Sequence, residues 1–248
     1  MPPVVASEAA SAGGSGGSDG PDGRHGPHAF VVDLEAPTLE LDDRRHLERV
    51  LRIRPGDPLT VSDGAGRWRA CAMGGELTTT GPIRTVPPPS PVLIVAFALV
   101  KGARPELVVQ KLTEMGVDEI VPFTAARSVA RWDDAKAGRQ LERLTKVARE
   151  ASMQSRRCHL PVVRSLRAFA EVAALPGAAL AERGGRPPSV ATTTVLIGPE
   201  GGWDDLERAA VVDQVDFGPQ VLRAETAALA VAAILAGLRA GVVNERLR

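Results

Sequence analysis

The stretch VLIGPEGGWDDLE, Val195 to Glu207, passes directly from an apolar segment into a turn that holds three glycines, one proline and one carboxylate. Its apolar start predicts a buried strand, and Asp204, Asp205 and Glu207 are residue types that begin helices. One glycine is enough to connect a strand to a helix. Three glycines within five residues predict that something comes close to the main chain here, with a tight strand-to-helix turn as the structural alternative.

Two familiar nucleotide-binding loops do not fit this turn. A phosphate-binding loop needs Lys followed by Ser or Thr after its glycines, and a dinucleotide-binding loop needs G-x-G-x-x-G after an early strand. Glu200 places a carboxylate in the turn, and that charge would repel phosphate. The turn therefore suits a ligand without phosphate groups that is bound through backbone groups.

The chain before this turn alternates between strand and helix patterns. Strands are expected in VLIVAFAL from Val92, in DEIVPF from Asp118 and in AALAE at 178–182. Helices are expected in RPELVVQKLTEMG at 104–116 and from about 138 to 157. This alternation predicts an α/β fold with a parallel sheet covered by helices on both faces, in which ligands bind beyond the carboxyl ends of the strands.

A second glycine-containing loop follows in FGPQVLRAETAALAVAAILAGLRAG, residues 217–241. A helix is expected from Glu225 to a stop at Gly241. It is apolar nearly all round, so it should be buried inside the domain or between subunits. Arg223 lies at the junction of this loop and the helix, so its positively charged guanidinium would be held near the GPEGG turn. The alternative is an arginine that is simply solvated.

The first part of the chain has another pattern. AFVVDL, PLTVSD and RWRACAM are short segments separated by glycine turns, which is typical of a small β-barrel or sheet. One helix is expected in LDDRRHLERVLRI, with Leu47, Val50 and Leu51 on its buried face.

Composition indicates how these parts are organised. Residues 1–27 are rich in Gly, Ser, Ala and Pro, and we expect a disordered tail there, with neither a secretory signal nor a transit peptide. A domain with a small β-barrel or sheet at 28–87 and an α/β domain at 91–248 should follow, joined by the proline-rich linker VPPPSP at 86–91.

The overall composition is that of a soluble globular protein, with 44% hydrophobic and 24% charged residues. No apolar run reaches the roughly 20 residues of a membrane span. Cys71 and Cys158 show no metal-ligand spacing and fit a reducing cytoplasm, so no metal is expected. Residues 101–167 carry 14 Lys and Arg against 8 Asp and Glu. This basic span indicates either phosphate contacts or a solvated helix face.

The two glycine-containing stretches together resemble the signature of the RsmE family, the 16S rRNA uridine-N3 methyltransferases of the SPOUT (α/β-knot) superfamily. The resemblance continues through HLERVLRIRPGD, DGAG, KGARPELVVQKLTEMGVDEIVPF and REASMQSRRCHLPVV, in the family's order, and covers nearly all of 30–241. It implies a PUA-like β-barrel that helps to hold RNA, followed by a trefoil-knotted SPOUT domain that binds S-adenosyl-L-methionine and forms a homodimer. The implied reaction is methylation of N3 of uridine 1498 in the 16S rRNA of the small ribosomal subunit.

The resemblance also implies which residues carry this function. The residues expected to bind the cofactor are Leu180, Glu182, Leu196, Ile197, Gly198, Pro199, Glu200, Gly201, Gly202, Phe217, Gly218, Val221, Leu222, Arg223, Thr226 and Ala227. The residues expected to contact RNA are Arg24, His28, Arg52, Lys101, Arg149, Gln154, Ser155, Arg156 and Arg157.

Two residues are candidates for the chemistry. Uracil N3 becomes a nucleophile when it loses its proton, and the resulting negative charge spreads onto O2 and O4, where Arg223 is expected to stabilise it. Glu225 would orient Arg223 or accept the proton, and capping of the helix is an equally good role for it. Two other functions stay open: methylation of another RNA, and an RNA-binding assembly factor that has lost catalysis.

Overall fold

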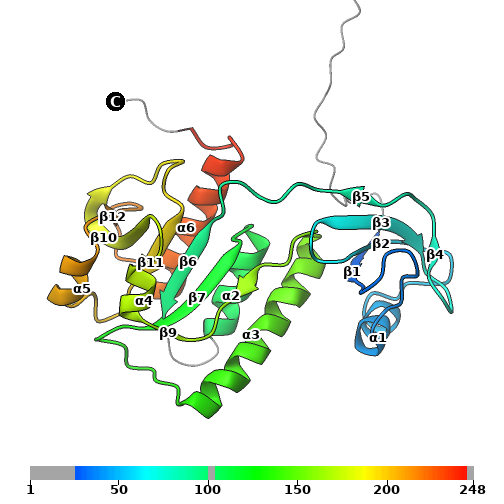
Figure 1. Cartoon of the computed structure of the whole chain (residues 1–248), viewed down its shortest axis with the longest axis horizontal. Helices are drawn as coiled ribbons and strands as arrows, with labels where there is room; N and C mark the ends of the chain where they lie inside the picture. Colours follow the sequence, from blue (N-terminus) through cyan, green and yellow to red (C-terminus); the bar gives the residue numbers. More distant parts are fainter. Residues whose placement is uncertain (1–25, 100–103, 245–248) are drawn as a thin grey trace, which may run out of the picture.

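The computed structural model describes residues 26–99 and 104–244, except for the side chain of Arg104 (Figure 1). Two β-sheets lie side by side, and the long helix α3 (Asp134–Ser155) runs from the larger sheet to the smaller one. The tail expected at residues 1–27 lies almost wholly outside the described residues. Among the described residues, no helix has both the length and the apolar character that a membrane crossing requires.

The smaller sheet is built from the first part of the chain. Its strands are β1 (His28–Phe30), β2 (Pro58–Ser62), β3 (Arg67–Ala72), β4 (Thr78–Thr79) and β5 (Arg84–Thr85). The order is β1-β2-β3-β4, with β5 also paired to β3; β1 runs parallel to β2, and the other pairs are antiparallel. Alternate residues of β2, such as Leu59 and Val61, pack with Leu47 in a core of their own.

Helix α1 (Leu41–Arg49) covers this core but buries less than the sequence pattern predicts. Leu47 is fully buried, whereas the side chains of Val50 and Leu51 are 63% and 48% exposed. The helix ends at Arg49, and Arg52 takes a left-handed backbone conformation with φ of 56°. The expected buried face is therefore wrong for Val50 and Leu51, because the chain leaves the helix before they can point inward.

The larger sheet is parallel, as the alternating pattern predicts. Its strands are β6 (Ile94–Ala98), β7 (Glu119–Thr124), β8 (Val162–Val163), β9 (Arg167–Ala168), β10 (Ala178–Arg186), β11 (Thr194–Ile197) and β12 (Gln214–Val215). The order is β12-β10-β11-β6-β7-β8, with β9 also paired to β7, and every pair is parallel. The carboxyl ends of the neighbouring strands therefore lie along one edge.

Helices cover both faces of this sheet. One face packs against α2 (Arg104–Glu114), α3 and α6 (Ala224–Arg239), and the other against α4 (Phe169–Ala173) and α5 (Asp205–Ala210). Strand β6 shows the division, because Val95 and Phe97 belong to one core while Ala96 and Ala98 belong to the other. A strand buried on both faces explains the unbroken apolar run in the sequence.

A short segment after α3 joins the two sheets directly. The Cys158 carbonyl accepts hydrogen bonds from Ser62 Oγ at 3.1 Å and from the Gly66 amide at 3.0 Å, and the Leu160 amide donates to the Gly64 carbonyl at 2.9 Å. A side chain at Gly66 would lie 2.4 Å from the His159 ring. The turn of the smaller sheet thus fits closely against residues 158–160.

Candidate active site

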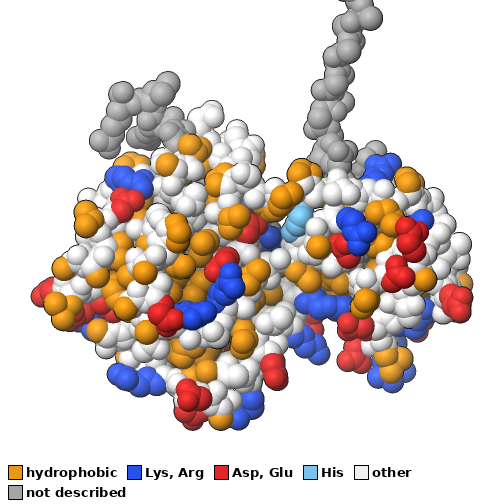
Figure 2. All heavy atoms as spheres, in the orientation of Figure 1, with side chains coloured by type: hydrophobic (Ala, Val, Ile, Leu, Met, Phe, Trp, Pro, Cys, Tyr) orange, Lys and Arg blue, Asp and Glu red, His pale blue; other side chains and the backbone are white. Residues whose placement is uncertain are grey.

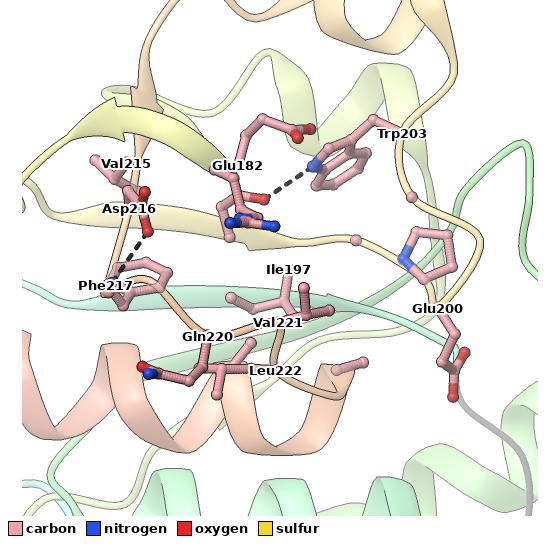
Figure 3. A pocket seen from close by; sticks show the side chains of 18 residues that line it. Glu182, Ile197, Glu200, Trp203, Val215, Asp216, Phe217, Gln220, Val221 and Leu222 are labelled. Atoms are coloured by element: carbon pink, nitrogen blue, oxygen red, sulfur yellow. Dashed lines mark hydrogen bonds between the residues drawn. The ribbon is translucent and has the colours of Figure 1, made fainter.

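A cavity of about 250 Å³ lies between the middle of β10 and the chain segments that follow β11 and β12, beside the start of α6 (Figure 3). Its lining consists of Ala181, Glu182, Arg183, Ile197, Gly198, Pro199, Glu200, Gly202, Trp203, Val215, Asp216, Phe217, Gly218, Gln220, Val221, Leu222, Ala224 and Ala227. The cavity is therefore at the edge of the sheet where the strand pattern places a ligand.

Most residues of the expected cofactor set line this cavity. Leu180 and Leu196 do not, because both are fully buried in the core against α4. Gly201, Arg223 and Thr226 belong to the surrounding loop and helix but are outside the lining. The structure thus brings the three predicted segments together at one cavity, and the two leucines belong to the core instead.

Each of the three glycines in the GPEGG turn is required for a different structural reason. A side chain at Gly198 would lie 2.9 Å from the Trp203 ring, and one at Gly201 would lie 3.2 Å from Arg127 Cβ. Gly202 has a φ of 70°, a conformation that other residues rarely adopt. Part of the close approach predicted from the sequence is therefore made by the protein itself.

Trp203 is a lining residue that the sequence reasoning missed. Its Nε1 donates to the Ala181 carbonyl at 3.1 Å, and its ring stacks on Phe123 with a centroid distance of 6.1 Å and an interplanar angle of 6°. These contacts hold the turn after β11 against β10 and β7. The available signal was the position of a large aromatic residue directly after two glycines.

Asp216 was also missed, and it joins two walls of the cavity. Its carboxylate accepts from the Gly218 amide at 3.0 Å (Figure 3) and from the Gly184 amide at 2.9 Å. These backbone hydrogen bonds hold the pKa of Asp216 below its ordinary value. A carboxylate two residues before a glycine is a common turn acceptor, so the pattern was present in the sequence.

The charges around the cavity favour a cation. Glu182, Glu200 and Asp216 contribute carboxylates to the lining, and Arg183 contributes a guanidinium. Glu182 also pairs with Arg208, whose Nε lies 3.3 Å from Glu182 Oε2. Among the described residues, no group of His, Cys, Asp and Glu side chains has an arrangement that would hold a metal ion.

A family model described as an RNA methyltransferase domain matches residues 88–236. The Ribosomal RNA small subunit methyltransferase E of Mycobacterium tuberculosis is 37% identical over 215 residues, which are 75% of this chain and 80% of that protein. The protein of the same name from Bacillus subtilis is 30% identical over 228 residues, or 79% and 88% of the two chains. This chain belongs to the RsmE family of RNA methyltransferases. The resemblance seen in the sequence is confirmed.

Solved structures of similar proteins share the α/β fold. One is a Ribosomal RNA small subunit methyltransferase E from Neisseria gonorrhoeae bound to S-adenosyl methionine, with 25% identity and a TM-score of 0.69 over 86% of this chain and 97% of that one. Another is a probable rRNA-methyltransferase from Porphyromonas gingivalis, with 26% identity and a TM-score of 0.70 over 88% and 100%. These likenesses agree with the parallel sheet described above.

The two candidate catalytic residues lie at the start of α6 in this RsmE-family chain. Arg223 is the exposed residue that precedes the helix, between the lining residues Leu222 and Ala224. Glu225 is in the first turn and half-buried. Both are next to the cavity without lining it, and their catalytic roles stay predictions.

The RNA contacts expected at His28 and Arg157 do not fit the structure. His28 is buried, with Nδ1 2.7 Å from Thr60 Oγ1, and burial lowers its pKa to about 4. The Arg157 side chain is 12% exposed and donates to the carbonyls of Thr113 and Val117. Burial lowers its pKa, an effect that the nearby Asp118 opposes. Neither side chain is available to an RNA phosphate, so both expectations are corrected.

Arg149 is half-buried and is paired with acidic neighbours. Its Nη1 donates to Asp43 Oδ1 at 2.9 Å and its Nη2 donates to Asp43 Oδ2 at 2.5 Å, and hydrogen bonding to this carboxylate raises its pKa. The pair joins α3 to α1. The guanidinium N–H groups that would bind a phosphate already donate to the buried Asp43 carboxylate. The expected RNA contact of Arg149 is therefore not supported either.

The other expected RNA residues in the described part of the chain are at least partly exposed. Arg52 and Gln154 are exposed, and Ser155 and Arg156 are half-buried at the end of α3. Arg24 and Lys101 lie outside the described residues. On the face shown in Figure 2, Lys and Arg side chains alternate with Asp and Glu rather than forming one continuous basic surface.

Proposed function

We propose that this chain methylates N3 of uridine 1498 in the 16S rRNA of the small ribosomal subunit, with S-adenosyl-L-methionine as the methyl donor. The relatives named Ribosomal RNA small subunit methyltransferase E and the neighbour bound to S-adenosyl methionine support this proposal. The observation that carries it is the cavity beside β10 and the carboxyl ends of β11 and β12, lined by both glycine loops of the family signature.

The residues of this cavity fit the proposed donor. S-adenosyl-L-methionine carries a sulfonium and an ammonium group and no phosphate, and the lining offers three carboxylates, of which Glu182 is paired with Arg208, against one guanidinium. Ile197, Trp203, Phe217 and Leu222 supply apolar surface suited to a purine ring. When bound, the donor supplies an electrophilic methyl group, so the protein has to align the uracil and exclude water.

The protein groups next to the cavity supply the remaining chemistry. Uracil N3 must lose its proton before it can attack, and charge then develops on O2 and O4. Arg223 adjoins two lining residues, and in this proposal its guanidinium stabilises that charge, an effect of about 3 kcal/mol for one good donor. Glu225 would orient Arg223 or take the proton, and its position in the first turn also suits capping of α6.

We also propose the finer architecture that the family implies. Residues 28–87 would form a PUA-like barrel and residues 91–248 a SPOUT domain with a trefoil knot, preceded by a tail at 1–27. The five-stranded smaller sheet and the neighbouring loops after β11 and β12 support this assignment. A substrate in the small ribosomal subunit places the working enzyme in the cytoplasm.

A homodimer forms part of the proposal. The outer side of α6 carries the incompletely buried apolar residues Leu229 and Ile234, and Val242 just beyond it is 81% exposed. An apolar helix face of this kind is suited to a second copy of the chain. Sedimentation equilibrium should give a dimer for the wild type and a monomer for Ile234→Arg. A fully active monomeric wild type would overturn this part.

The experiment that tests the function is mass mapping of modified nucleosides in 16S rRNA from a strain that lacks the gene. The N3-methyl group on uridine 1498 should disappear and return when the wild-type gene is supplied. Loss of a methyl group from a different RNA would indicate another substrate. An unchanged methylation pattern, together with no cofactor binding by calorimetry, would indicate an assembly factor without catalysis.

A further inference from the structure

One buried carboxylate connects the ends of two strands that are not neighbours in the sheet. Glu207 is 5% exposed; its Oε1 accepts from the Ala126 amide at 2.8 Å, and its Oε2 accepts from the Asp204 amide at 3.0 Å. Ala126 follows β7, whereas Asp204 follows the GPEGG turn after β11, and β6 lies between these strands. Each oxygen of Glu207 therefore holds a different segment.

A second connection lies beside the first. Arg127 Nη1 donates to the Gly201 carbonyl at 3.2 Å, and a Cβ at Gly201 would lie 3.2 Å from Arg127 Cβ. The segment 125–128 is itself fixed, because the Ala125 amide donates to the buried Ser128 Oγ at 3.1 Å. A fixed turn after β7 thus contacts both Gly201 of the GPEGG turn and Glu207 at the start of α5.

We propose that residues 125–128 and Glu207 form a clamp that holds the GPEGG turn in the shape that binds S-adenosyl-L-methionine. None of these residues lines the cavity, so Arg127 and Glu207 are positioning residues. Hydrogen bonds to a charged acceptor are among the stronger ones in proteins, and a loop ordered before binding loses less entropy when the ligand enters. The inference rests on the proposed function, since it assumes that this cavity holds the cofactor.

The decisive variant is Glu207→Gln, which keeps the shape of the side chain. Its amide NH2 would face one of the two backbone N–H groups, so one hydrogen bond becomes a donor–donor contact. The Kd for S-adenosyl-L-methionine should rise about tenfold, while kcat at saturating cofactor stays within about twofold of the wild type. That split distinguishes positioning of the loop from a general loss of structure.

A matched control is Glu171→Gln. Glu171 caps α4 in the same manner, since its Oε2 accepts from the Ala168 amide at 2.8 Å, but it is not part of the cavity. Its substitution should leave the cofactor Kd unchanged. If Glu171→Gln weakens binding as much as Glu207→Gln does, the effect is general and the clamp is overturned.

Arg127 gives a test that does not depend on a buried substitution. Arg127→Ala should raise the cofactor Kd by about threefold, and Arg127→Lys should recover part of the affinity because it keeps a cationic donor. This pair decides the matter if Glu207→Gln does not fold. The clamp would be overturned if a folded Arg127→Ala variant bound the cofactor with wild-type affinity and Glu207→Gln either had an unchanged cofactor Kd or did not fold.

Hydrogen exchange separates the clamp from the proposed function. Without any cofactor, amides in residues 198–204 should exchange faster in Arg127→Ala and Glu207→Gln than in the wild type and Glu171→Gln. A wild type that does not bind S-adenosyl-L-methionine would contradict the proposed function, and the exchange rates would still judge the clamp. Unchanged exchange in both variants would overturn it.

Discussion

Arg157 and Asp118 form a buried ion pair, with Arg157 Nη2 3.2 Å from Asp118 Oδ1. The other carboxylate oxygen of Asp118 is bound by Arg239, the last residue of α6. The ends of α3 and α6 therefore meet at the start of β7. This arrangement gives a structural role to an arginine that the family resemblance would assign to RNA.

The ion pair predicts opposite outcomes for two adjacent arginines. Arg157→Glu places a carboxylate beside Asp118 and leaves Arg239 to neutralise both, so the free energy of unfolding should fall by about 3 to 5 kcal/mol. Arg156→Glu changes a half-buried side chain outside this cluster and should alter stability by less than about 1 kcal/mol. Urea denaturation of both variants measures the difference. Equal stability would mean that the buried pair does not support the fold.

Arg156 then becomes the cleaner probe of RNA binding. Arg156→Glu should weaken binding to a 16S rRNA fragment and lower the slope of its salt dependence by roughly one unit, the effect of one lost phosphate contact. Cofactor affinity should not change. An unchanged salt slope would show that Arg156 contacts no phosphate.

The cofactor cavity is sensitive to a side chain at Gly202. Apart from the two adjacent residues of the chain, the nearest atom to a Cβ built there is Arg208 Nη2 at 4.0 Å, and Gly202 lines the cavity, so we expect a valine to occupy the ligand's space. Gly202→Val should abolish binding of S-adenosyl-L-methionine and cost about 1 to 3 kcal/mol of stability through its positive φ. Gly56→Val is the control, because Gly56 has a φ of 93°, open space and no contact with the cavity. Tight cofactor binding by a folded Gly202→Val variant would contradict the assignment of the cavity.

Arg223 should affect chemistry more than binding. Arg223→Ala should lower the single-turnover methylation rate by roughly a hundredfold at saturating RNA and cofactor, as expected when one fixed charge donor is removed. Arg167→Ala is the control, because Arg167 is also exposed and pairs with Glu171 away from the cavity. If the rate constant of Arg223→Ala equals that of the wild type, another group stabilises the charge on the uracil.

His28 makes stability depend on pH. Its pKa is about 4 in the folded protein and 6.5 in a model peptide, so between these values the unfolded chain binds a proton that the folded chain does not. The stability contributed by the neutral His28 should therefore be fully present above about pH 6.5. The free energy of unfolding should fall by about 3 kcal/mol as the pH drops to 4. Thermal denaturation across this range should show a flatter profile for His28→Gln than for wild type. His46→Gln, at an exposed position on α1, is the control.

Local patterns predicted the parts of this protein that depend on local physics. A strand buried on both faces requires a continuous apolar run, and turns require glycine, so the parallel sheet and the cavity-forming segments were visible in the sequence. The partner of a charged side chain is set by contacts between distant residues. Asp118 and Asp43 are far from Arg157 and Arg149 along the chain, and no spacing shows that these arginines face inward.

Contacts between residues far apart in the chain also explain which features of the cavity could not be predicted from the sequence. The sequence places Glu207 correctly at the start of α5, where it caps the helix. Its second hydrogen bond, to Ala126, spans 81 positions of the chain and exists only because β7 and β11 end at the same edge of the sheet. Trp203 likewise meets Phe123 only in the folded sheet.

The hydrogen bonds between the turn at 62–66 and residues 158–160 also bear on how the two sheets behave mechanically. A protease that cuts the proline-rich stretch at 86–91 would sever one covalent connection and leave this second attachment in place. The nicked fragments should therefore migrate together in native gel filtration. The smaller sheet is accordingly not free to reorient on a flexible linker. The hydrogen bonds to residues 158–160 maintain its orientation toward the cavity.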